Sequence, residues 1–231
     1  MWSPNIDGGG NHKGFPLRLS EVNRYITMIN ETDIIKKRYD RLAPYFDRIE
    51  SMMEKMMMGE LRASIWQKVQ GEKILEVGVG TGKNFPHYPA KAITAIDFSP
   101  AMINEASKKR KNLGVVVDLS IMDVQQLDFP DNHFDSVIGT FLFCSVPGPK
   151  QGLLELKRVC KPGSEVLLLE HVLSSNKFAA AVMHLLNPIT VRLVGANINR
   201  ETVKTVQACG FSKVEVLPES THIVKLIRAV K

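Results

Sequence analysis

The stretch LEVGVGTG, residues 75–82, joins the end of a short apolar run to a turn that holds three glycines. The run itself, KILEV at residues 73–77, has the length and the branched side chains of a buried strand. Glycines in the spacing GxGxG let a backbone turn tightly and approach a bound molecule closely. The stretch therefore predicts a strand followed by a ligand-binding loop, although the spacing alone also fits a tight turn without a ligand.

Outward from this loop, short apolar runs alternate with segments of helix length. The runs lie at residues 92–96, 115–121, 134–139 and 165–170, and the helix-length segments include residues 100–112 and 150–160. Strands that alternate with helices predict a parallel sheet covered on both faces. Two final runs, residues 211–218 and 222–230, are so close together that only an antiparallel hairpin can join them.

The chain before the loop has a helical pattern. Residues 21–69 carry apolar side chains at three- and four-residue steps, which is typical of amphipathic helices. Pro44 lies within this segment, and we expect it to separate two helices. Residues 1–20 are rich in glycine, proline and asparagine and predict a flexible start.

The glycine loop favours a cationic ligand over a pyrophosphate. A dinucleotide-binding loop reads GxGxxG, and Lys83 stands where its third glycine would be. Glu76 precedes the first glycine by two residues, where it would repel a pyrophosphate but attract the sulfonium and ammonium groups of S-adenosylmethionine (SAM). These two residues disfavour a nicotinamide oxidoreductase and indicate a SAM site.

Two aspartates extend this site. Asp97 ends the second predicted strand, where a carboxylate accepts hydrogen bonds from ribose hydroxyls. Asp123 follows the third strand, where its carboxylate can accept from the adenine amino group while Val124 donates its backbone N–H. Each aspartate alone also fits a helix or loop cap. Because the carboxyl ends of parallel strands meet at one edge of a sheet, the loop and both aspartates together predict one SAM site.

Four motifs resemble the class I SAM-dependent methyltransferases over residues 35–230. They are LEVGVGTG (75–82), AIDFSPAMINEA (95–106), LDFPDNHFDSVIGTFLFCSV (127–146) and LKRVCKPGSEVLLLEHV (156–172). The nearest groups include the quinone-biosynthesis C-methyltransferases and the bacterial phosphatidylethanolamine N-methyltransferases. GVGTGKNFPHYP (78–89), FLFCSVPGP (141–149), EHVLSSN (170–176) and GANINRETVKTVQACGFSKVEV (195–216) are most similar to the membrane-associated thiol S-methyltransferases of animals and their bacterial relatives.

The resemblance implies an α/β fold. Its core would be a Rossmann-like seven-stranded sheet of order 3-2-1-4-5-7-6, with strand 7 antiparallel, helices on both faces and an N-terminal helical cap. We expect residues 1–34 to form a flexible segment and a first helix, and residues 35–231 to form the methyltransferase domain. Within that domain, residues 35–70 would be the helical cap and residues 172–200 an insertion that covers the methyl acceptor.

The resemblance also implies which residues contact the cofactor, whose product is S-adenosylhomocysteine. They are Glu76, Gly78, Gly80, Asp97, Phe98, Met102, Asp123, Val124 and Phe141. Nearby positions add Tyr45, Gly82, Asn84 and Ser99 to the predicted cofactor site.

The acceptor site is expected to follow the fourth and fifth strands. His171 is a candidate general base, because an unperturbed imidazole has a pKa near 6.5, and a structural capping role is the alternative. Tyr39 is a second candidate catalytic residue. Cys144 is expected to be a pocket wall rather than a nucleophile. The predicted acceptor pocket comprises Cys144, Ser145, Met53, Met57, His184, Asn197 and Arg200, and no metal-ligand spacing occurs.

Charge and composition narrow the partners. The net charge is +6, and residues 171–231 contribute +5 of it, with eight Lys or Arg against three acids. This predicts contact with an anionic membrane surface rather than with nucleic acid, for which no binding module is evident. Three cysteines are too few for a disulfide framework, and neither a signal peptide nor a bilayer-spanning stretch is present. We expect a cytoplasmic protein, with peripheral membrane contact and oligomeric state left open.

The function predicted is methyl transfer from SAM to an apolar small molecule or lipid. A thiol sulfur is favoured, a phospholipid amine comes second and a quinol carbon third, since these acceptors need an increasingly strong base. A different class of protein, a SAM-binding regulator without turnover, stays open because a cofactor site alone does not exclude it.

Overall fold

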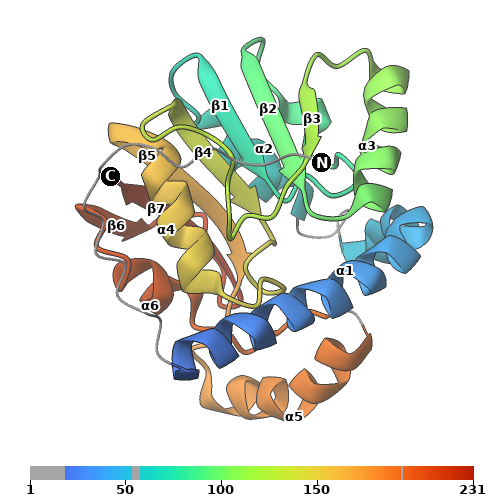
Figure 1. The fold of residues 1–231 in the computed structure, drawn as a ribbon, viewed down its shortest axis with the longest axis vertical. Coiled ribbons are helices and arrows are strands. Elements are labelled where there is room, and N and C mark those ends of the chain that lie inside the picture. Colours follow the sequence, from blue (N-terminus) through green and yellow to red (C-terminus); the bar gives the residue numbers. More distant parts are fainter. Residues whose placement is uncertain (1–18, 54–57, 194) are drawn as a thin grey trace, which may run out of the picture.

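The computed structural model describes residues 19–53, 58–193 and 195–231, with the side chains of residues 19–30, 50, 52 and 53 left out. Its centre is one mixed sheet (Figure 1). The strands are β1 (Lys73–Val77), β2 (Ala92–Asp97), β3 (Asp118–Ile121), β4 (Phe134–Thr140), β5 (Cys160–His171), β6 (Lys213–Val216) and β7 (Val224–Val230). Their order is β3-β2-β1-β4-β5-β7-β6, and β7 runs antiparallel to β5 and β6, so the predicted topology is confirmed.

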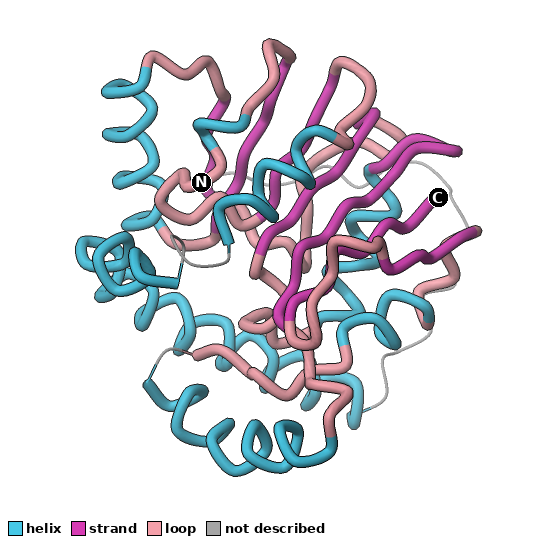
Figure 2. The backbone as a smooth tube through the Cα atoms, turned by 180° about the vertical axis from the view of Figure 1, so that it is seen from behind, coloured by secondary structure: helices cyan, strands magenta, loops and turns pink. Residues whose placement is uncertain are grey.

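Helices cover both faces of the sheet, as Figure 2 shows from the far side. The helices that flank it are α2 (Gly59–Gln67), α3 (Pro100–Leu113), α4 (Pro149–Val159) and α6 (Thr202–Gln207), and a short 3-10 turn, η2, spans Phe85–His87. Alternate residues of β5 enter different cores, as side chains on a pleated strand must. Leu168 packs with α4 and α6, whereas Leu167 and Leu169 pack with α2 and η2.

The first helix is longer than the sequence predicts. Helix α1 runs unbroken over Leu19–Met53 with Pro44 inside it, so the expected break at that proline is wrong. An internal proline removes one hydrogen bond and costs a helix about 3 kcal/mol. Contacts on both sides of it hold α1 in place, because Asp40 accepts from Ser99 and Asp47 accepts from Thr81. The domain boundary predicted between residues 34 and 35 falls inside this helix.

The third strand is shorter than expected. The run at residues 115–121 is strand only from Asp118 onward. Gly114 ends α3 in the left-handed conformation, and Val115 then donates its backbone N–H to the Arg110 carbonyl 3.1 Å away. The first residues of the run therefore complete the helix cap before the strand begins.

Two helices lie across the carboxyl edge of the sheet. They are α1 and α5 (Lys177–Leu193), and Figure 1 shows them next to each other beyond the ends of the parallel strands. Arg38 of α1 donates from Nη1 to the Val191 carbonyl of α5 at 2.6 Å. None of the described helices is long and apolar enough to cross a membrane. The pair encloses the edge where an open α/β sheet binds its ligands.

Candidate functional site

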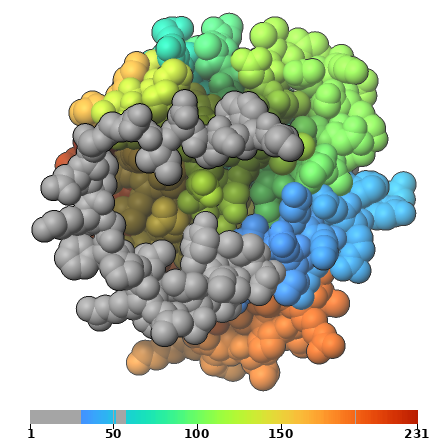
Figure 3. All heavy atoms as spheres, viewed as in Figure 1, coloured from blue at the N-terminus to red at the C-terminus, as the bar shows by residue number. Residues whose placement is uncertain are grey.

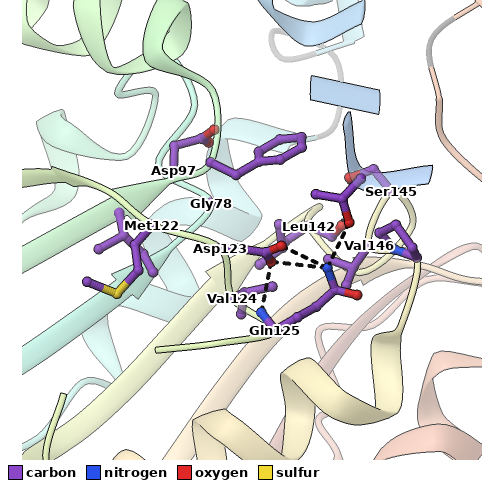
Figure 4. A pocket seen from close by; sticks show the side chains of 13 residues that line it. Gly78, Asp97, Met122, Asp123, Val124, Gln125, Leu142, Ser145 and Val146 are labelled. Atoms are coloured by element: carbon purple, nitrogen blue, oxygen red, sulfur yellow. Dashed lines mark hydrogen bonds between the residues drawn. The ribbon is translucent and has the colours of Figure 1, made fainter. Parts of the chain in front are cut away.

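A cavity of about 610 Å³ lies between the carboxyl edge of the sheet and the two covering helices. Its walls come from α1, α2, the glycine loop, the loop after β4, the end of β5 and the segment after α5. A smaller hollow adjoins it beside β2 and β3 (Figure 4), and both are bordered by Gly78, Asp97, Phe98, Leu142 and Ser145. An elongated ligand that bends at Asp97 would therefore occupy both.

Two of the three glycines in the loop pack tightly against neighbouring side chains, and the third faces open space. Gly78, Gly80 and Gly82 all have positive φ, at 70°, 54° and 79°, where other residues are strained. A Cβ at Gly78 would lie 2.8 Å from Leu142, and one at Gly82 would lie 2.4 Å from Phe85. A Cβ at Gly80 would meet nothing within 4 Å. Gly78 and Gly80 line the cavity, whereas Gly82 packs behind it.

Asp97 links the loop to the second strand. Its Oδ2 accepts from the Gly80 backbone N–H at 2.9 Å, and its Oδ1 accepts from the Ser99 N–H at 2.9 Å. Burial, together with the nearby negative charge of Asp40, raises the pKa of this carboxyl to about 6. A carboxylate offers about four acceptor positions, so it can still accept from a ligand hydroxyl.

Ser99 does not line either cavity. It is the N-cap of α3, where Oγ accepts from the Met102 N–H at 3.1 Å and donates to Asp40 of α1 at 2.5 Å. Ser99 therefore caps α3, and its contact with the cofactor stays a prediction. Phe98 and Met102, predicted together with it, do line the larger cavity.

The smaller hollow brings together residues from the ends of β2 and β3. Asp123 and Val124, which the sequence predicts as cofactor contacts, line it together with Met122 (Figure 4). Phe98 lines it as well. The Asp123 carboxylate also accepts from the backbone N–H of Gln125 at 2.9 Å, so its loop-capping role is present too. Gln125, which the sequence reasoning missed, donates from Nε2 to Thr32 of α1 at 3.1 Å and thereby closes the hollow.

Glu76 and Asn84 lie beneath the loop rather than in the cavity. The fully buried Glu76 carboxylate accepts hydrogen bonds from Asn84 Nδ2 and from the Tyr88 hydroxyl, and burial raises its pKa to about 7. Asn84 also donates to Thr140 Oγ1 at 2.9 Å. Their polar groups have partners within the protein, and their contact with the cofactor stays a prediction.

Helix α1 directs a different aromatic side chain towards the larger cavity from the one that the sequence predicts. Tyr45 is 60% exposed and borders neither cavity, whereas its neighbour Phe46 lines the larger one. Tyr39 lines it as well and packs edge-on against Phe98, with ring centroids 5.9 Å apart. Tyr45 is thus corrected to a surface residue, because one step along a helix rotates the side chain by about 100°.

The methionine predictions are only partly covered. Residue Met57 lies outside the described residues, as does the side chain of Met53. Met58 is buried and lines the larger cavity. This placement agrees with methionine's tendency to fill irregular apolar space.

His171 lines the larger cavity, at the end of β5. Burial lowers the pKa of its imidazole, while a backbone hydrogen bond with Ile198 acts in the opposite direction. Within the described part of the chain, its buried Nδ1 has no hydrogen-bond partner. Because Nδ1 is buried while His171 lines the cavity, another part of the imidazole faces the cavity. Ser145 lines the same cavity, with its hydroxyl donating to the Leu142 carbonyl at 2.9 Å.

Four predicted acceptor residues do not border the cavity. Cys144 is buried, and its thiol donates to the Phe141 carbonyl at 3.4 Å. Asn197 donates to the Cys144 carbonyl from its backbone at 2.8 Å, and Arg200 donates to the Val146 carbonyl at 2.6 Å. His184 is exposed on α5, next to Asn199 at 3.0 Å. Asn197 and Arg200 thus hold the loop after β4, and their role in the acceptor pocket stays a prediction.

Glu170 holds the same loop from beneath. Its Oε1 accepts from the backbone N–H groups of Leu142 and Phe143, both at 3.0 Å, and burial raises its pKa to about 8. Phe141 begins the loop in the left-handed region, with φ at 54°, and lines the larger cavity. A strained residue next to a ligand cavity persists only where its surroundings hold it, which Glu170 and Arg200 do here.

Arg62 is the main site residue that the sequence reasoning missed. It is 5% exposed, donates from Nη1 to Thr140 at 2.8 Å and to Asn84 at 3.1 Å, and lies 5.0 Å from the centre of the Phe141 ring. It lines the larger cavity. The signal was present, because Arg62 interrupts the buried stripe of Ile65 and Trp66 at helical spacing.

No metal site is found in the described ranges, 19–53, 58–193 and 195–231. Within them, no group of three or more His, Cys, Asp or Glu side chains is arranged to hold an ion.

Comparisons with known proteins agree with this geometry. A family model described as a methyltransferase domain matches residues 75–168, which span the glycine loop through most of β5. The phosphatidylethanolamine N-methyltransferase of Cereibacter sphaeroides is 36% identical over 158 residues, which are 66% of this chain and 75% of that protein. The thiol S-methyltransferase TMT1B of Rattus norvegicus is 28% identical over 165 residues, covering 65% of this chain and 68% of that one.

A solved structure supports the fold independently. A SAM-dependent methyltransferase of Thermotoga maritima superposes with a TM-score of 0.60 at 20% identity, over 84% of this chain and 99% of that one. With the phosphatidylethanolamine relative at 36% identity, the chain belongs to the class I SAM-dependent methyltransferases, and SAM is its cofactor.

Proposed function

We propose that this enzyme transfers the methyl group of SAM to an apolar small molecule or lipid, and that a thiol sulfur is the favoured acceptor atom. The observation that supports this proposal is the set of residues that surrounds His171 in the larger cavity. There the imidazole of His171 lines the cavity together with the apolar side chains of Ile198, Ile223 and Val224. An apolar wall with one polar group at its centre suits a ligand with a single reactive atom.

The cofactor would extend from the smaller hollow into the larger cavity. Asp123 would accept from the adenine amino group, and Asp97 would accept from the ribose hydroxyls. The methionine portion would pass Gly80 towards Arg62, whose guanidinium offers a charged partner for a carboxylate. The lining of the two cavities supports this course, since both share Asp97 and the larger one contains Arg62.

Methyl transfer to a thiol requires only modest help from the protein. The sulfur lone pair forms a bond to the methyl carbon while the bond from that carbon to the sulfonium breaks, and neutral S-adenosylhomocysteine leaves. A free thiol has a pKa of about 8.5 and is mostly protonated at neutral pH. His171 is the group that would accept its proton, because burial lowers its pKa and keeps the imidazole neutral.

A phospholipid amine is the second candidate acceptor, and one observation favours it. Arg62 and Lys83 both line the larger cavity, so cationic groups are present where a headgroup phosphate would need them. A quinol carbon is the third candidate. Its methylation would use the same base on the quinol hydroxyl, but no residue in the cavity favours it specifically.

We expect the acceptor to be identified by a turnover screen. Purified enzyme with SAM would be offered an alkyl thiol, phosphatidylethanolamine vesicles and a demethylated quinol, and S-adenosylhomocysteine would be quantified. The thiol should give the largest kcat/KM, because it is the best nucleophile of the three near neutral pH. A larger value with phosphatidylethanolamine would replace the thiol assignment with the amine.

The His171→Asn variant is expected to lower kcat for the thiol by about 100-fold and to leave KM for SAM unchanged. Its pH profile distinguishes a base from a structural residue. In the wild type, kcat should fall as the pH drops through the lowered pKa of His171, because the protonated imidazole no longer accepts a proton. In the variant, kcat should no longer fall over this pH range. A wild-type pH dependence retained in His171→Asn would rule out the assigned role.

The location of the enzyme follows from the same proposal. All three cysteines are buried free thiols, which suits a reducing cytoplasm. Peripheral contact with an anionic membrane is supported by the charge of residues 171–231, which contain eight Lys or Arg and only three acids. Such contact would bring an apolar or lipid acceptor to the enzyme.

A further inference from the structure

Helix α5 carries an apolar face that points away from the protein. This α5 apolar face consists of Phe178, Val182, Leu185, Leu186, Ile189 and Leu193. Phe178 is 81% exposed and Leu185 is 76% exposed, whereas Met183 is the buried residue of the helix. The six residues recur at three- and four-residue steps, so they share one side of the helix. An isolated exposed leucine is ordinary, but a continuous stripe of six large residues indicates an interaction surface.

The charge around this face is positive. Residues 171–200 contain no Asp or Glu, and Lys177 and Arg192 stand near the two ends of α5. The neighbouring helix α1, which adjoins α5 on the surface in Figure 3, adds the exposed Lys37 and Arg41 and also the exposed Glu31 and Asp33. Large apolar residues beside Lys and Arg are the combination that binds the interface of an anionic bilayer.

The charge also argues against a second copy of this chain as the occupant. A two-fold contact would place one α5 against another, and both carry basic residues with no acids between them. Like charges brought together across an interface oppose association. An anionic lipid surface matches both the apolar and the basic components of this face.

The same segment also forms part of the cavity wall. Thr190 of α5 lines the larger cavity, as do Ala196 and Ile198 just beyond the helix. Asn187 fastens this wall, because its Oδ1 accepts from the Ile198 backbone N–H at 2.9 Å. A helix with its side chains is about 10 Å across, so only that thickness separates the apolar face from the cavity.

We propose that α5 lies in the plane of an anionic membrane surface, with the α5 apolar face among the acyl chains and Lys177 and Arg192 at the headgroups. In this orientation the cavity wall formed by Thr190, Ala196 and Ile198 sits at the membrane interface. An acceptor dissolved in the bilayer then reaches the cavity without crossing bulk water. The delivery role rests on the proposed function, whereas the membrane contact does not.

Vesicle sedimentation tests the contact with full-length protein. The wild type should bind phosphatidylcholine vesicles that contain phosphatidylglycerol, bind pure phosphatidylcholine more weakly, and dissociate as salt is raised. The double variant Phe178→Glu/Leu185→Glu should bind the anionic vesicles at least about tenfold more weakly, because it places charges in the acyl region. Lys177→Glu/Arg192→Glu should lose the preference for anionic vesicles.

A matched control carries the same charges elsewhere. Leu113→Glu/Val116→Glu changes two exposed apolar residues at the end of α3, at the opposite end of the sheet from α5 in Figure 1, and should bind vesicles as the wild type does. All variants should keep the wild-type circular dichroism and affinity for SAM. Turnover of a short alkyl thiol without vesicles reports the proposed function separately, and should be the same in the α5 variants and the wild type.

Three results would overturn the contact. They are wild-type protein that stays in the supernatant with anionic vesicles, an α5 variant that binds as tightly as the wild type, and a concentration-dependent dimer that Phe178→Glu/Leu185→Glu dissociates. The last result, from sedimentation velocity, would assign the α5 apolar face to a second copy. If thiol turnover is absent while vesicle binding follows the expected pattern, the proposed function fails and the membrane contact stands.

Discussion

The Asp97→Ala variant is expected to lower the affinity for SAM by about 100-fold or more in titration calorimetry. A hydrogen bond to a charged group contributes about 1.5–3 kcal/mol, and Asp97 has positions for two ribose hydroxyls. Two such bonds correspond to at least about 3 kcal/mol, which is more than a factor of 100 in the dissociation constant. The same carboxylate holds the Gly80 N–H, so its loss also loosens the glycine loop.

Two comparisons make this result specific. Asp118→Ala removes an exposed carboxylate at the amino end of β3 and should bind SAM as the wild type does. Wild-type affinity should also fall as the pH is lowered below about 6, because burial raises the Asp97 pKa to about 6 and the protonated group accepts fewer hydrogen bonds. Undiminished SAM binding by Asp97→Ala would contradict the assigned site.

The Gly80→Val variant is expected to abolish measurable SAM binding while the protein still folds. The added side chain would meet no protein atom within 4 Å of its Cβ, so it would project into the space of the larger cavity. Its cost to folding is the strain of a positive φ, about 1–2 kcal/mol for a residue with a Cβ. The substitution should therefore reduce SAM binding more than it reduces the stability of the fold.

Gly114→Val is the matched control. Gly114 has φ at 66° and likewise has nothing within 4 Å of a built Cβ, but it ends α3 away from both cavities. Thermal unfolding should show a similar loss of stability in the two variants, and calorimetry should show a loss of SAM affinity only in Gly80→Val. Equal SAM affinity in both would mean that the cofactor does not pass Gly80.

The sheet could be predicted from the sequence because each of its elements has a local signal. Apolar runs separated by helical segments indicate a parallel sheet, and the close final pair indicates a hairpin. Gly78, Gly80, Asp97 and Asp123 follow from the same reasoning, since they stand at strand ends. The structure places all four at the two cavities.

The direction of a side chain could not be read from spacing alone. Glu76 alternates with Leu75 and Val77 along β1, which pack in the core under α4 and α6, so its carboxylate points to the opposite face. There it meets Asn84 and Tyr88 beneath the loop. Its charge suggested a ligand contact, but the pleat of the strand directs it into a buried network.

The positions of the other site residues depend on tertiary contacts. Phe46 lines the cavity instead of Tyr45 because of how α1 is rotated about its axis. The hydrogen bonds of α1 to Ser99 and Thr81 fix that rotation. Arg200 holds a loop more than 50 residues away in the chain, at Val146. Such partners are brought together only by the folded sheet, and a single sequence carries no local pattern for them.

The most direct test of the central claim is a single-turnover reaction of the wild type with methyl-labelled SAM and an alkyl thiol, followed by mass spectrometry. We expect one S-adenosylhomocysteine for each labelled thioether, and neither product with Asp97→Ala. Stable SAM binding without S-adenosylhomocysteine from the thiol, phosphatidylethanolamine or quinol would contradict methyl transfer and would make this chain a SAM-binding regulator.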